Sequence, residues 1–348
     1  MIKDLFDMSL KTFDGYGHDN SIVFKSATTC YRSEEHTTKT PEQFVEMLKH
    51  NKHLAMLEFT YYTFAIEFNI VAFTKYYNEI RNIKDLFEKF KYFETSDVIH
   101  PMKSEIFFIS GNGRAWMDFF ASIRSITSYE CYVLGSLLKK LQEANITMFN
   151  ETCVNNISIV NYNNNEQNII LDIELFDSNE SFYKYYSQKH LSVNDINDEV
   201  LLKHFWFSFK AEGVSRGLTH ELVRHRTFSF AQSSSRYIDN KNFDLKFDIE
   251  GFKENIVKEN SAIAVNGMLE RIDILVEGMK NVYDMFKNTY KVKNDIIRQI
   301  LPIGISNEIC FAANLKSLNH FLELRLSKNA HPEIRCLAQM VVDSINKK

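Results

Sequence analysis

Proline and glycine are scarce in this sequence, which has 4 Pro and 11 Gly among 348 residues. Linkers between domains are commonly rich in these residues, so the composition marks no domain boundary. Hydrophobic residues make up 45% of the chain, which is enough for a substantial core. This length and composition allow one large domain or two smaller ones, and we expect a single domain over residues 1–348.

Cysteine pairs are also missing. The five cysteines are odd in number and scattered, and no two of them form a Cys-x-x-Cys pair. A disulfide framework or a thiolate metal site would need paired spacings, so we expect reduced thiols, no bound metal and a cytoplasmic location. The cysteines are Cys30, Cys131, Cys153, Cys310 and Cys336.

No apolar run is long enough to cross a bilayer. Acidic residues interrupt the first 17 residues, where a secretory signal needs an apolar core. The net charge is −4 and the isoelectric point is near 6.3, so no global basic field points to nucleic acid. We expect a soluble protein that binds neither membranes nor nucleic acids.

Apolar periodicity predicts helices and strands along the chain. Helical spacing, with apolar residues on one face, occurs over residues 41–51, 214–226, 251–286, 314–327 and 332–345. Aromatic and β-branched runs with partial alternation predict strands over residues 57–68, 205–213 and 227–238. In the last of these, alternation would point Gln232, Ser234 and Arg236 to one face of the strand.

Residues 68–205 mix helical patterns with an Asn-rich turn at residues 161–168, which lies between two apolar runs and predicts a hairpin. Residues 107–125 and 308–327 resemble each other, because each stretch joins an apolar strand, an Asn, a basic residue and an apolar helix. This similarity indicates a duplicated strand–helix unit, on the limited basis of two short matches. The alternative for the first stretch is an ordinary helix start in a packed unit.

The densest chemical signal lies in residues 221–237, where Arg-His-Arg at 224–226 precedes a serine-rich run that ends in Arg236 and Tyr237. Guanidinium groups bind phosphate through two donors, and hydroxyls complete the shell of its oxygens. The segment therefore predicts an anion site. Taken alone, Arg-His-Arg is more typical of a solvated helix end, where cations favour the negative dipole. The serine-rich run that follows it weighs against that alternative. His220 and His225 are five residues apart, which is too far round a helix for a shared zinc.

The stretch THELVRHRTFSFAQSSSRY resembles the signature of flavin-dependent thymidylate synthases, which is Arg-His-Arg, seven residues, then Ser-x-Arg. Three further segments agree, in the family's order: TTCYRS, HLAMLEF and LPIGISNEICFAANLKSLNHFLELRLSKNAHPEIR. The resemblance implies reductive methylation of dUMP to dTMP, with NADPH-reduced FAD as hydride source and methylenetetrahydrofolate as carbon donor. We predict an α/β (α+β) fold, with an antiparallel-rich central sheet flanked by helices and a large insertion over residues 68–205. A homotetramer with shared active sites is expected.

The resemblance also implies roles for single residues. The expected catalytic residues are Arg325, beside the uracil ring, and His53, on the flavin and folate side. The expected flavin-binding positions are Arg224, His225, Arg226, Gln232, Asn314, Lys316, His320 and Ala55. The expected dUMP-binding residues are Glu221, Arg224, Gln232, Ser233, Ser234, Ser235, Arg236, Arg298 and Arg325. The reaction needs no protein nucleophile, so Cys310 and Cys336 are expected to be packing thiols.

Arg325 continues an otherwise apolar stripe of its helix, where a cation needs a buried partner that a bound nucleotide would supply. The alternative is an Arg whose stem packs while its head reaches water. Three positions depart from the family pattern: Ala55 replaces a usual Ser, Phe59 a usual His, and Lys316 a usual Arg. Residues 57–68 and 205–216 both resemble the same family strand, so the start of the insertion is open.

Two other functions fit the same residues. A related flavin- and folate-dependent enzyme would hydroxymethylate or otherwise modify a pyrimidine nucleotide while using the same contacts. A non-enzymatic nucleotide- or RNA-binding protein would use the basic, serine-rich strand, and its affinity would fall steeply with salt. Product analysis separates the first from thymidylate synthesis, and a colourless purified protein would favour the second.

Overall fold

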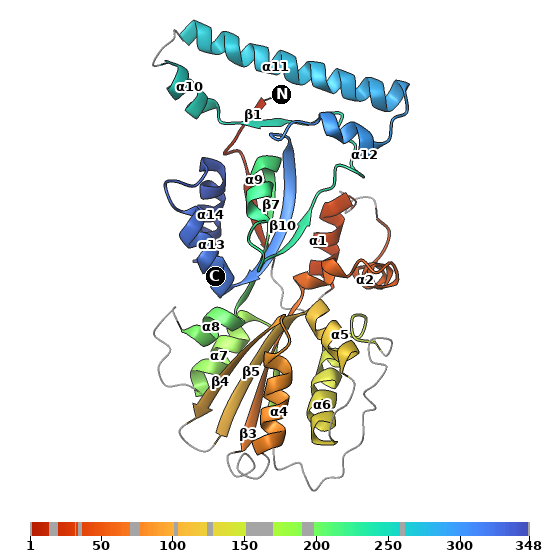
Figure 1. Ribbon diagram of the computed structural model, residues 1–348, viewed down its shortest axis with the longest axis vertical. Helices are drawn as coiled ribbons and strands as arrows, with labels where there is room; N and C mark the ends of the chain where they lie inside the picture. Colours follow the sequence, from red (N-terminus) through yellow and green to blue (C-terminus); the bar gives the residue numbers. More distant parts are fainter. Residues whose placement is uncertain are drawn as a thin grey trace.

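Two four-stranded antiparallel sheets lie end to end along the long axis of the molecule (Figure 1). The computed structural model describes residues 2–13, 20–31, 33, 37–69, 77–100, 104–123, 128–150, 170–189, 198–257 and 262–346. The predicted class, antiparallel-rich sheets flanked by helices, is confirmed. The strands between residues 61 and 176 build a second sheet of their own, which the sequence did not predict.

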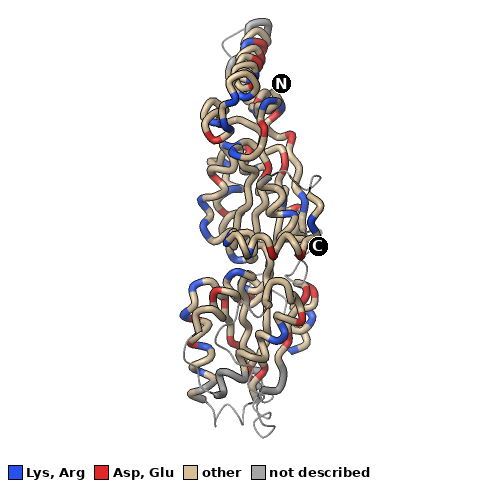
Figure 2. Tube along the Cα trace, turned by 90° about the vertical axis from the view of Figure 1, so that its right-hand side faces the viewer, with Lys and Arg blue, Asp and Glu red and all other residues tan. Residues whose placement is uncertain are grey.

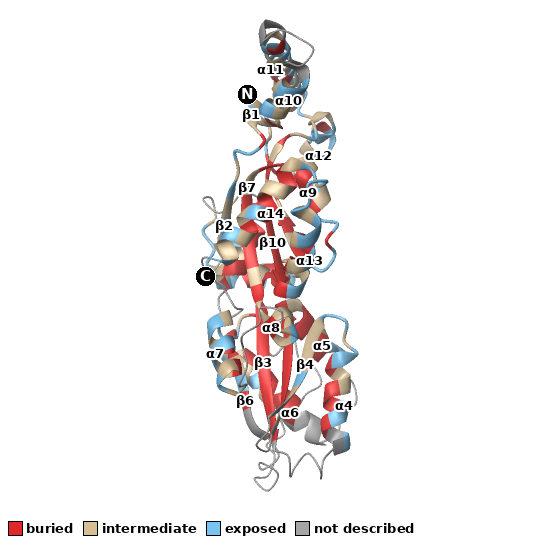
Figure 3. Cartoon of the chain, turned by 90° about the vertical axis from the view of Figure 1, so that its left-hand side faces the viewer, coloured by how far each residue is buried: buried red, intermediate tan, exposed pale blue. Residues whose placement is uncertain are grey.

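We call the two sheets the upper and the lower sheet, after their places in Figure 1. The upper sheet has, in order, β2 (Ser9–Phe13), β7 (Trp206–Ser215), β10 (Ser306–Asn314) and β8 (Ser229–Gln232). The lower sheet has, in order, β4 (Phe93–His100), β5 (Ser104–Asn112), β3 (Tyr61–Asn69) and β6 (Ile170–Phe176). The central strands of both sheets are buried along most of their length (Figure 3).

Helices cover both faces of the upper sheet. On one side lie α9 (Arg216–Leu222), α13 (Leu315–Arg325) and α14 (Pro332–Ile345), and on the other α1 (Ser21–Tyr31) and α2 (Pro41–His50). Because successive strand residues point to opposite faces, β10 contributes to two clusters of buried residues. Ile309 and Phe311 pack with α13 and α14, whereas Cys310 and Ala312 pack on the side of α1.

The lower sheet is covered in the same way, by α4 (Tyr77–Glu88), α5 (Gly113–Ser122) and α6 (Ser128–Ala144) on one side and by α7 (Asn179–Lys189) and α8 (Glu199–His204) on the other. A 3-10 helix, η1 (Leu54–Phe59), leads into β3. Its last turn packs against β8 of the upper sheet, so the two sheets are linked through this segment.

A third layer caps the far end of the upper sheet. There β1 (Ile2–Asp4) pairs in parallel with β9 (Leu245–Phe247), and the long α11 (Ala262–Asp284) lies across them (Figure 1). The remaining elements of this layer are α10 (Ile249–Val257), η3 (Met285–Thr289), α12 (Asn294–Ile297) and η4 (Arg298–Ile300). No helix in the described ranges is long and apolar enough to cross a membrane. Charges of both signs are interspersed over the molecule (Figure 2).

Most predicted helices are confirmed. The helix predicted over residues 41–51 is α2, which begins at Pro41 with a capping box from Thr40 and Gln43. The last two predicted helices are α13 and α14, and the long one over residues 251–286 becomes α10 and α11 on either side of residues 258–261. The second arm of the predicted hairpin is β6, whereas the first arm lies outside the described residues.

Three predicted elements are too long. The strand predicted over residues 57–68 begins only at Tyr61, because Leu54–Phe59 form the 3-10 helix η1. The helix predicted over residues 214–226 spans only Arg216–Leu222, because β7 extends to Ser215, whose hydroxyl oxygen caps the helix by accepting from the Leu218 N–H at 2.9 Å. The strand predicted over residues 227–238 ends at Gln232. Beyond it the chain turns, because the Ser234 N–H donates to the Cys30 carbonyl of α1 rather than continuing the ladder.

Candidate active site

Arg325 lies in a cluster with two residues of the Arg-His-Arg region. Its Nη1 donates to Oε2 of Glu221 at 2.9 Å, and its Nε donates to Nε2 of His225 at 3.1 Å. The structure therefore brings together three expected site residues, from the last turn of α13 and the end of α9. Arg325 needs a partner for its charge, and within the chain the Glu221 carboxylate supplies one, in addition to the nucleotide that was expected to do so.

Glu221, Arg224 and His225 do not lie together on one helix face. The helix ends at Leu222, so Arg224 is exposed while His225 turns inward and packs against the rings of Phe228 and Phe321. Burial, aided by the positive charges of Arg325 and His320, lowers the pKa of His225 from 6.5 to about 4. His225 is therefore neutral near pH 7, as its acceptance of the Arg325 hydrogen bond requires.

The free energy of unfolding is expected to fall in acid partly because of His225. Its pKa is lower in the folded than in the unfolded chain, so its stabilising contribution is present above about pH 6.5 and is lost as the pH falls towards about 4. Urea unfolding of wild type and His225→Gln at several pH values measures this, since Gln retains an acceptor but does not titrate. An equal loss of stability in the two proteins would contradict the assignment.

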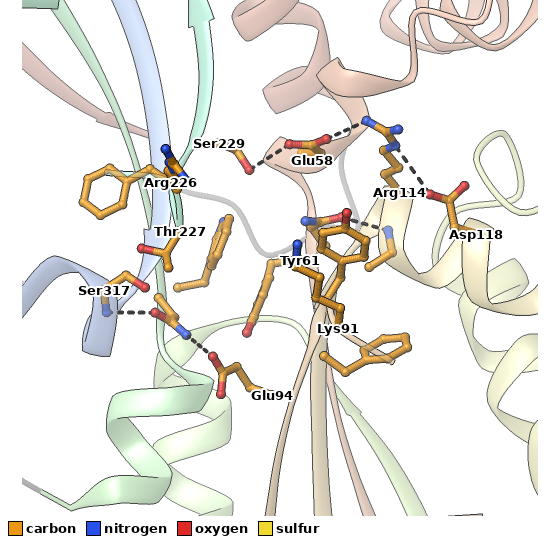
Figure 4. Close-up of a pocket in the computed structure, with 17 residues that line it drawn as sticks. Glu58, Tyr61, Lys91, Glu94, Arg114, Asp118, Arg226, Thr227, Ser229 and Ser317 are labelled. Atoms are coloured by element: carbon orange, nitrogen blue, oxygen red, sulfur yellow. Dashed lines mark hydrogen bonds and ion pairs between the residues drawn. The ribbon is translucent and has the colours of Figure 1, made fainter. Parts of the chain in front are cut away.

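A pocket of about 320 Å³ lies between the two sheets (Figure 4). We call it the inter-sheet pocket. Arg226, Thr227 and Ser317 line it from the part of the chain that carries the upper sheet, and Lys91 and Arg114 line it from the part that carries the lower sheet (Figure 4). The other lining residues are Glu58, Tyr61, Tyr92, Phe93, Glu94, Asn112, Ala115, Asp118, Trp206, Phe228, Ser229 and Asn314.

Hydrogen bonds join the two sides of the inter-sheet pocket. The amide of Asn314, which caps α13 by accepting from the Ser317 N–H at 2.9 Å, donates to Oε1 of Glu94 at 3.3 Å. Oε2 of Glu58 accepts from the Ser229 hydroxyl at 3.3 Å, and its Oε1 accepts from Nη1 of Arg114 at 2.8 Å. Glu94 and Arg114, which lie within residues 68–205, thus hold Asn314 and Glu58, which lie outside that range.

A second pocket, of about 400 Å³, contains Arg298 and Ser235, both expected to bind dUMP. We call it the arginine pocket. Arg216 and His220 also line it, and the pKa of Arg216 is lowered, first by burial and then by the charge of Arg298. Two guanidinium groups that disfavour each other's charge form a site that an anion would stabilise.

The serine-rich run does not present one face to a ligand. The Ser233 hydroxyl is buried against the Asn307 side chain, and Gln232 donates to the Thr219 hydroxyl at 2.8 Å. Of the three serines, Ser235 reaches the arginine pocket, whereas Ser234 accepts from the Arg236 N–H at 3.4 Å within a turn. The contacts of this turn therefore decide where these side chains point, and the alternation of side chains along an extended strand does not apply.

Several expected residues lie on the surface of the described chain. Arg224, Arg236, Lys316 and His320 are exposed, and so are His53 and Ala55, at the start of η1. None of these six lines either pocket among the described residues. His320 is still close enough for its charge to lower the pKa of His225. The roles of His53 and Ala55 stay predictions.

The structure adds residues that the sequence interpretation missed. Arg216 and His220 join the arginine pocket, and Tyr61 and Arg114 join the inter-sheet pocket. Only Arg114 had a sequence signal, the internal similarity around residues 107–125. The thiol of Cys310 has its pKa raised by burial to about 12, as expected of a packing cysteine rather than a nucleophile.

Comparisons with known proteins match much of this chain. The family model described as thymidylate synthase complementing protein matches residues 137–348, more than half of the chain. A flavin-dependent thymidylate synthase of Nitratidesulfovibrio vulgaris is 32% identical over 143 residues, which is 40% of this chain and 56% of that protein. One of Pyrococcus furiosus is 33% identical over 166 residues, which is 46% of this chain and 63% of that protein.

The chain thus spans about 56% to 63% of the length of these curated relatives. The crystal structure of thymidylate synthase X from Helicobacter pylori with FAD and dUMP is 22% identical, with a TM-score of 0.34 over 48% of this chain and 86% of that one. The family match begins at residue 137, so the resemblance of TTCYRS and HLAMLEF stays a prediction. The chain belongs to the family of thymidylate synthase complementing proteins, and the resemblance carried by its Arg-His-Arg signature is confirmed.

Proposed function

We propose that this protein is a flavin-dependent thymidylate synthase, which converts dUMP to dTMP with FAD, NADPH and methylenetetrahydrofolate. The observation that carries the proposal is the placement of Arg325, half-buried between Glu221 and a neutral His225 within the family signature. Family membership and relatives named flavin-dependent thymidylate synthase support the same activity.

Arg325 is suited to act on the pyrimidine ring. Methylation at carbon 5 builds negative charge on the ring, and a fixed guanidinium beside N3 stabilises that charge without reorganising. Glu221 and His225 hold the guanidinium through two of its nitrogens. Because His225 is neutral, it orients Arg325 without adding a second positive charge.

The arginine pocket is suited to hold the dUMP phosphate. Arg216, Arg298 and Ser235 present two guanidinium groups and a hydroxyl to one cavity. Charge-assisted hydrogen bonds to phosphate oxygens are about twice as strong as neutral ones. The expected substrate roles of Arg298 and Ser235 are kept, with Arg216 and His220 added to the set.

Arg298→Ala is expected to weaken dUMP binding about 10- to 100-fold, since one hydrogen bond to a charged group contributes about 1.5–3 kcal/mol. Flavin content should not change, because Arg298 is exposed on η4 and does not line the inter-sheet pocket. Isothermal titration with dUMP and the flavin absorbance of the same samples measure both. Lys253→Ala, a partly exposed cation of α10 that pairs with Glu250, is the matched control. An equal loss of flavin and dUMP would contradict separate sites.

The inter-sheet pocket fits a cofactor such as FAD. Its volume lies within the range of ligand sites, about 300–1,000 Å³, and it combines aromatic rings with cations. Neither Lys91 nor Arg226 forms an ion pair with a described carboxylate, so both are available to phosphate. Arg226 and Asn314 would hold the cofactor, which when bound and reduced supplies the hydride.

The decisive experiment is product analysis with the purified full chain. Incubation with dUMP, methylenetetrahydrofolate, FAD and NADPH should yield dTMP, and flavin absorbance should bleach with NADPH and change when dUMP is added. A hydroxymethylated nucleotide instead of dTMP would point to a sister reaction on the same contacts. Failure to bind FAD would refute a flavoenzyme and favour a non-enzymatic nucleotide-binding protein.

We further propose a homotetramer in the cytoplasm. Several apolar side chains of α11 face solvent, among them Ile274 at 71% and Leu275 at 62% exposure, which is typical of an interface surface. Cys30, Cys310 and Cys336 are free thiols, which suits a reducing compartment. The native mass in solution, compared with 40.8 kDa for one chain, tests the oligomeric state.

A further inference from the structure

The two sheets have corresponding topologies. Following the chain, the first central strand of each sheet, β3 or β7, pairs antiparallel with the second, β5 or β10, and each central strand also pairs with one edge strand. In both sheets the second strand ends in an Asn that lies opposite the first residue of the first strand. These pairs are Asn112 with Tyr61 and Asn314 with Trp206.

The helix that follows each second strand begins in the same way. Asn112 accepts from the Ala115 N–H at 2.8 Å, and Asn314 accepts from the Ser317 N–H at 2.9 Å. A basic residue follows each Asn at the second position, Arg114 in α5 and Lys316 in α13. The internal similarity in the sequence is therefore a similarity of structure.

The two units differ in chemistry at one position. Counting from the two Asn residues, Ile123 stands where the other unit has Arg325, and Ile123 is buried at 7% exposure. The lower unit thus keeps the Asn-x-basic start of its helix but lacks the arginine proposed to act on the pyrimidine. The lower unit can therefore form the wall of a pocket, but it lacks the arginine that a second nucleotide site would need.

The two units meet at the inter-sheet pocket. Tyr61 and Trp206, which hold corresponding positions, stack with ring centroids 4.1 Å apart and an interplanar angle of 4°. Both line the pocket, as do the two capping residues, Asn112 and Asn314. The pocket is therefore walled by equivalent parts of the two units, one from each sheet.

Unused donors remain at this pocket. Arg114 engages Glu58 through Nη1 and approaches Asp118 through Nε at 3.5 Å, which leaves its Nη2 without a described acceptor. The buried indole Nε1 of Trp206 likewise has no hydrogen-bond partner in the described part of the chain. These donors, together with Lys91 and Arg226, which form no ion pair with a carboxylate of the described chain, suit a phosphate-bearing ligand with a planar ring.

We propose that the lower sheet is a second, altered copy of the unit that carries the family site, and that it supplies one wall of the cofactor pocket within the same chain. In this wall, Arg114 would contact the phosphate groups of the ligand, and the exposed Tyr92 would contact its planar ring. The ligand class is a planar-ring compound with phosphate groups, which is FAD if the proposed function holds; the assignment rests on that function. Residues 68–205 then have a defined role, to complete the pocket.

The test measures FAD and dUMP binding separately on the full chain, after removal of bound flavin. Arg114→Glu is expected to weaken FAD binding at least tenfold and to leave dUMP binding within about twofold, because charge reversal repels phosphate only at this pocket. Tyr92→Ala, at an exposed position that the fold does not need, should weaken FAD binding about threefold or more. Lys139→Ala, an exposed cation on α6, is the control and should change neither affinity.

The outcomes separate the two proposals. Wild-type chain that binds no FAD overturns the proposed function and this assignment with it. Wild-type chain that binds FAD, with Arg114→Glu and Tyr92→Ala both unchanged, overturns only the role of the lower sheet. Parallel loss of FAD and dUMP binding in Arg114→Glu, with Tyr92→Ala unchanged, would make Arg114 a structural residue and also overturns the assignment.

Discussion

Arg325→Ala is expected to reduce dTMP formation by about 100- to 1,000-fold while the chain stays folded. The guanidinium is the charge proposed to stabilise the pyrimidine anion, and removing one such preorganised donor typically has an effect of this size. The fold should persist because Arg325 is in the last turn of α13 and is partly exposed, at 19% of its side-chain surface. Single-turnover dTMP formation and thermal unfolding of the same samples measure both quantities.

Two further variants sharpen this prediction. Arg325→Lys keeps the charge but loses the contacts that Nε and Nη1 make to His225 and Glu221, so it should recover only part of the rate. Arg335→Ala on α14 is the matched control and should retain activity, since the Arg335 guanidinium donates to the Lys328 carbonyl at 3.1 Å and lines neither the inter-sheet pocket nor the arginine pocket. Near-normal turnover by Arg325→Ala would remove Arg325 from the chemistry.

Trp116→Ala is expected to lower the free energy of unfolding by about 3–5 kcal/mol, the usual cost of deleting a large buried aromatic side chain. Trp116 is fully buried in the lower sheet's core, and its ring contacts those of Phe64, Phe93 and Phe120. Its indole N–H also donates to the Tyr62 carbonyl at 3.4 Å, a bond that Ala cannot replace. Urea unfolding followed by circular dichroism gives the change.

The control for this prediction is Tyr183→Ala on α7. Tyr183 belongs to the same part of the molecule but is 42% exposed, so its loss should cost less than about 1 kcal/mol. A similar small loss in Trp116→Ala would mean that the lower core does not contribute to global stability. The comparison therefore tests whether residues 68–205 fold together with the rest of the chain.

Local patterns predicted the regular helices well. The helices α2 and α14 each begin at a proline and bury one apolar stripe, so their extents follow from neighbouring residues alone. The end of β7 did not follow, because the Ser215 N–H and hydroxyl both donate to the carboxylate of Glu333, 118 residues away. Contacts of that range leave no periodic trace in the sequence.

The sequence likewise predicted only part of the candidate active site. The signature identified the residue types, and Arg325, Glu221 and His225 do meet in the structure. Their pairing was not predictable, since Arg325 and Glu221 are 104 residues apart and the ligand had been the expected partner. The face assigned to Ser234 was also wrong, because a hydrogen bond to the Cys30 carbonyl turns the chain there.

The sequence by itself determined the family, the residues of the signature and the helices whose apolar stripes are local. It also contained the similarity between residues 107–125 and 308–327, but not its meaning. Only the tertiary structure decided that the two units form separate sheets and face each other through Tyr61 and Trp206. The physical reason is that packing between distant segments depends on complementary surfaces, which no periodicity within one segment encodes.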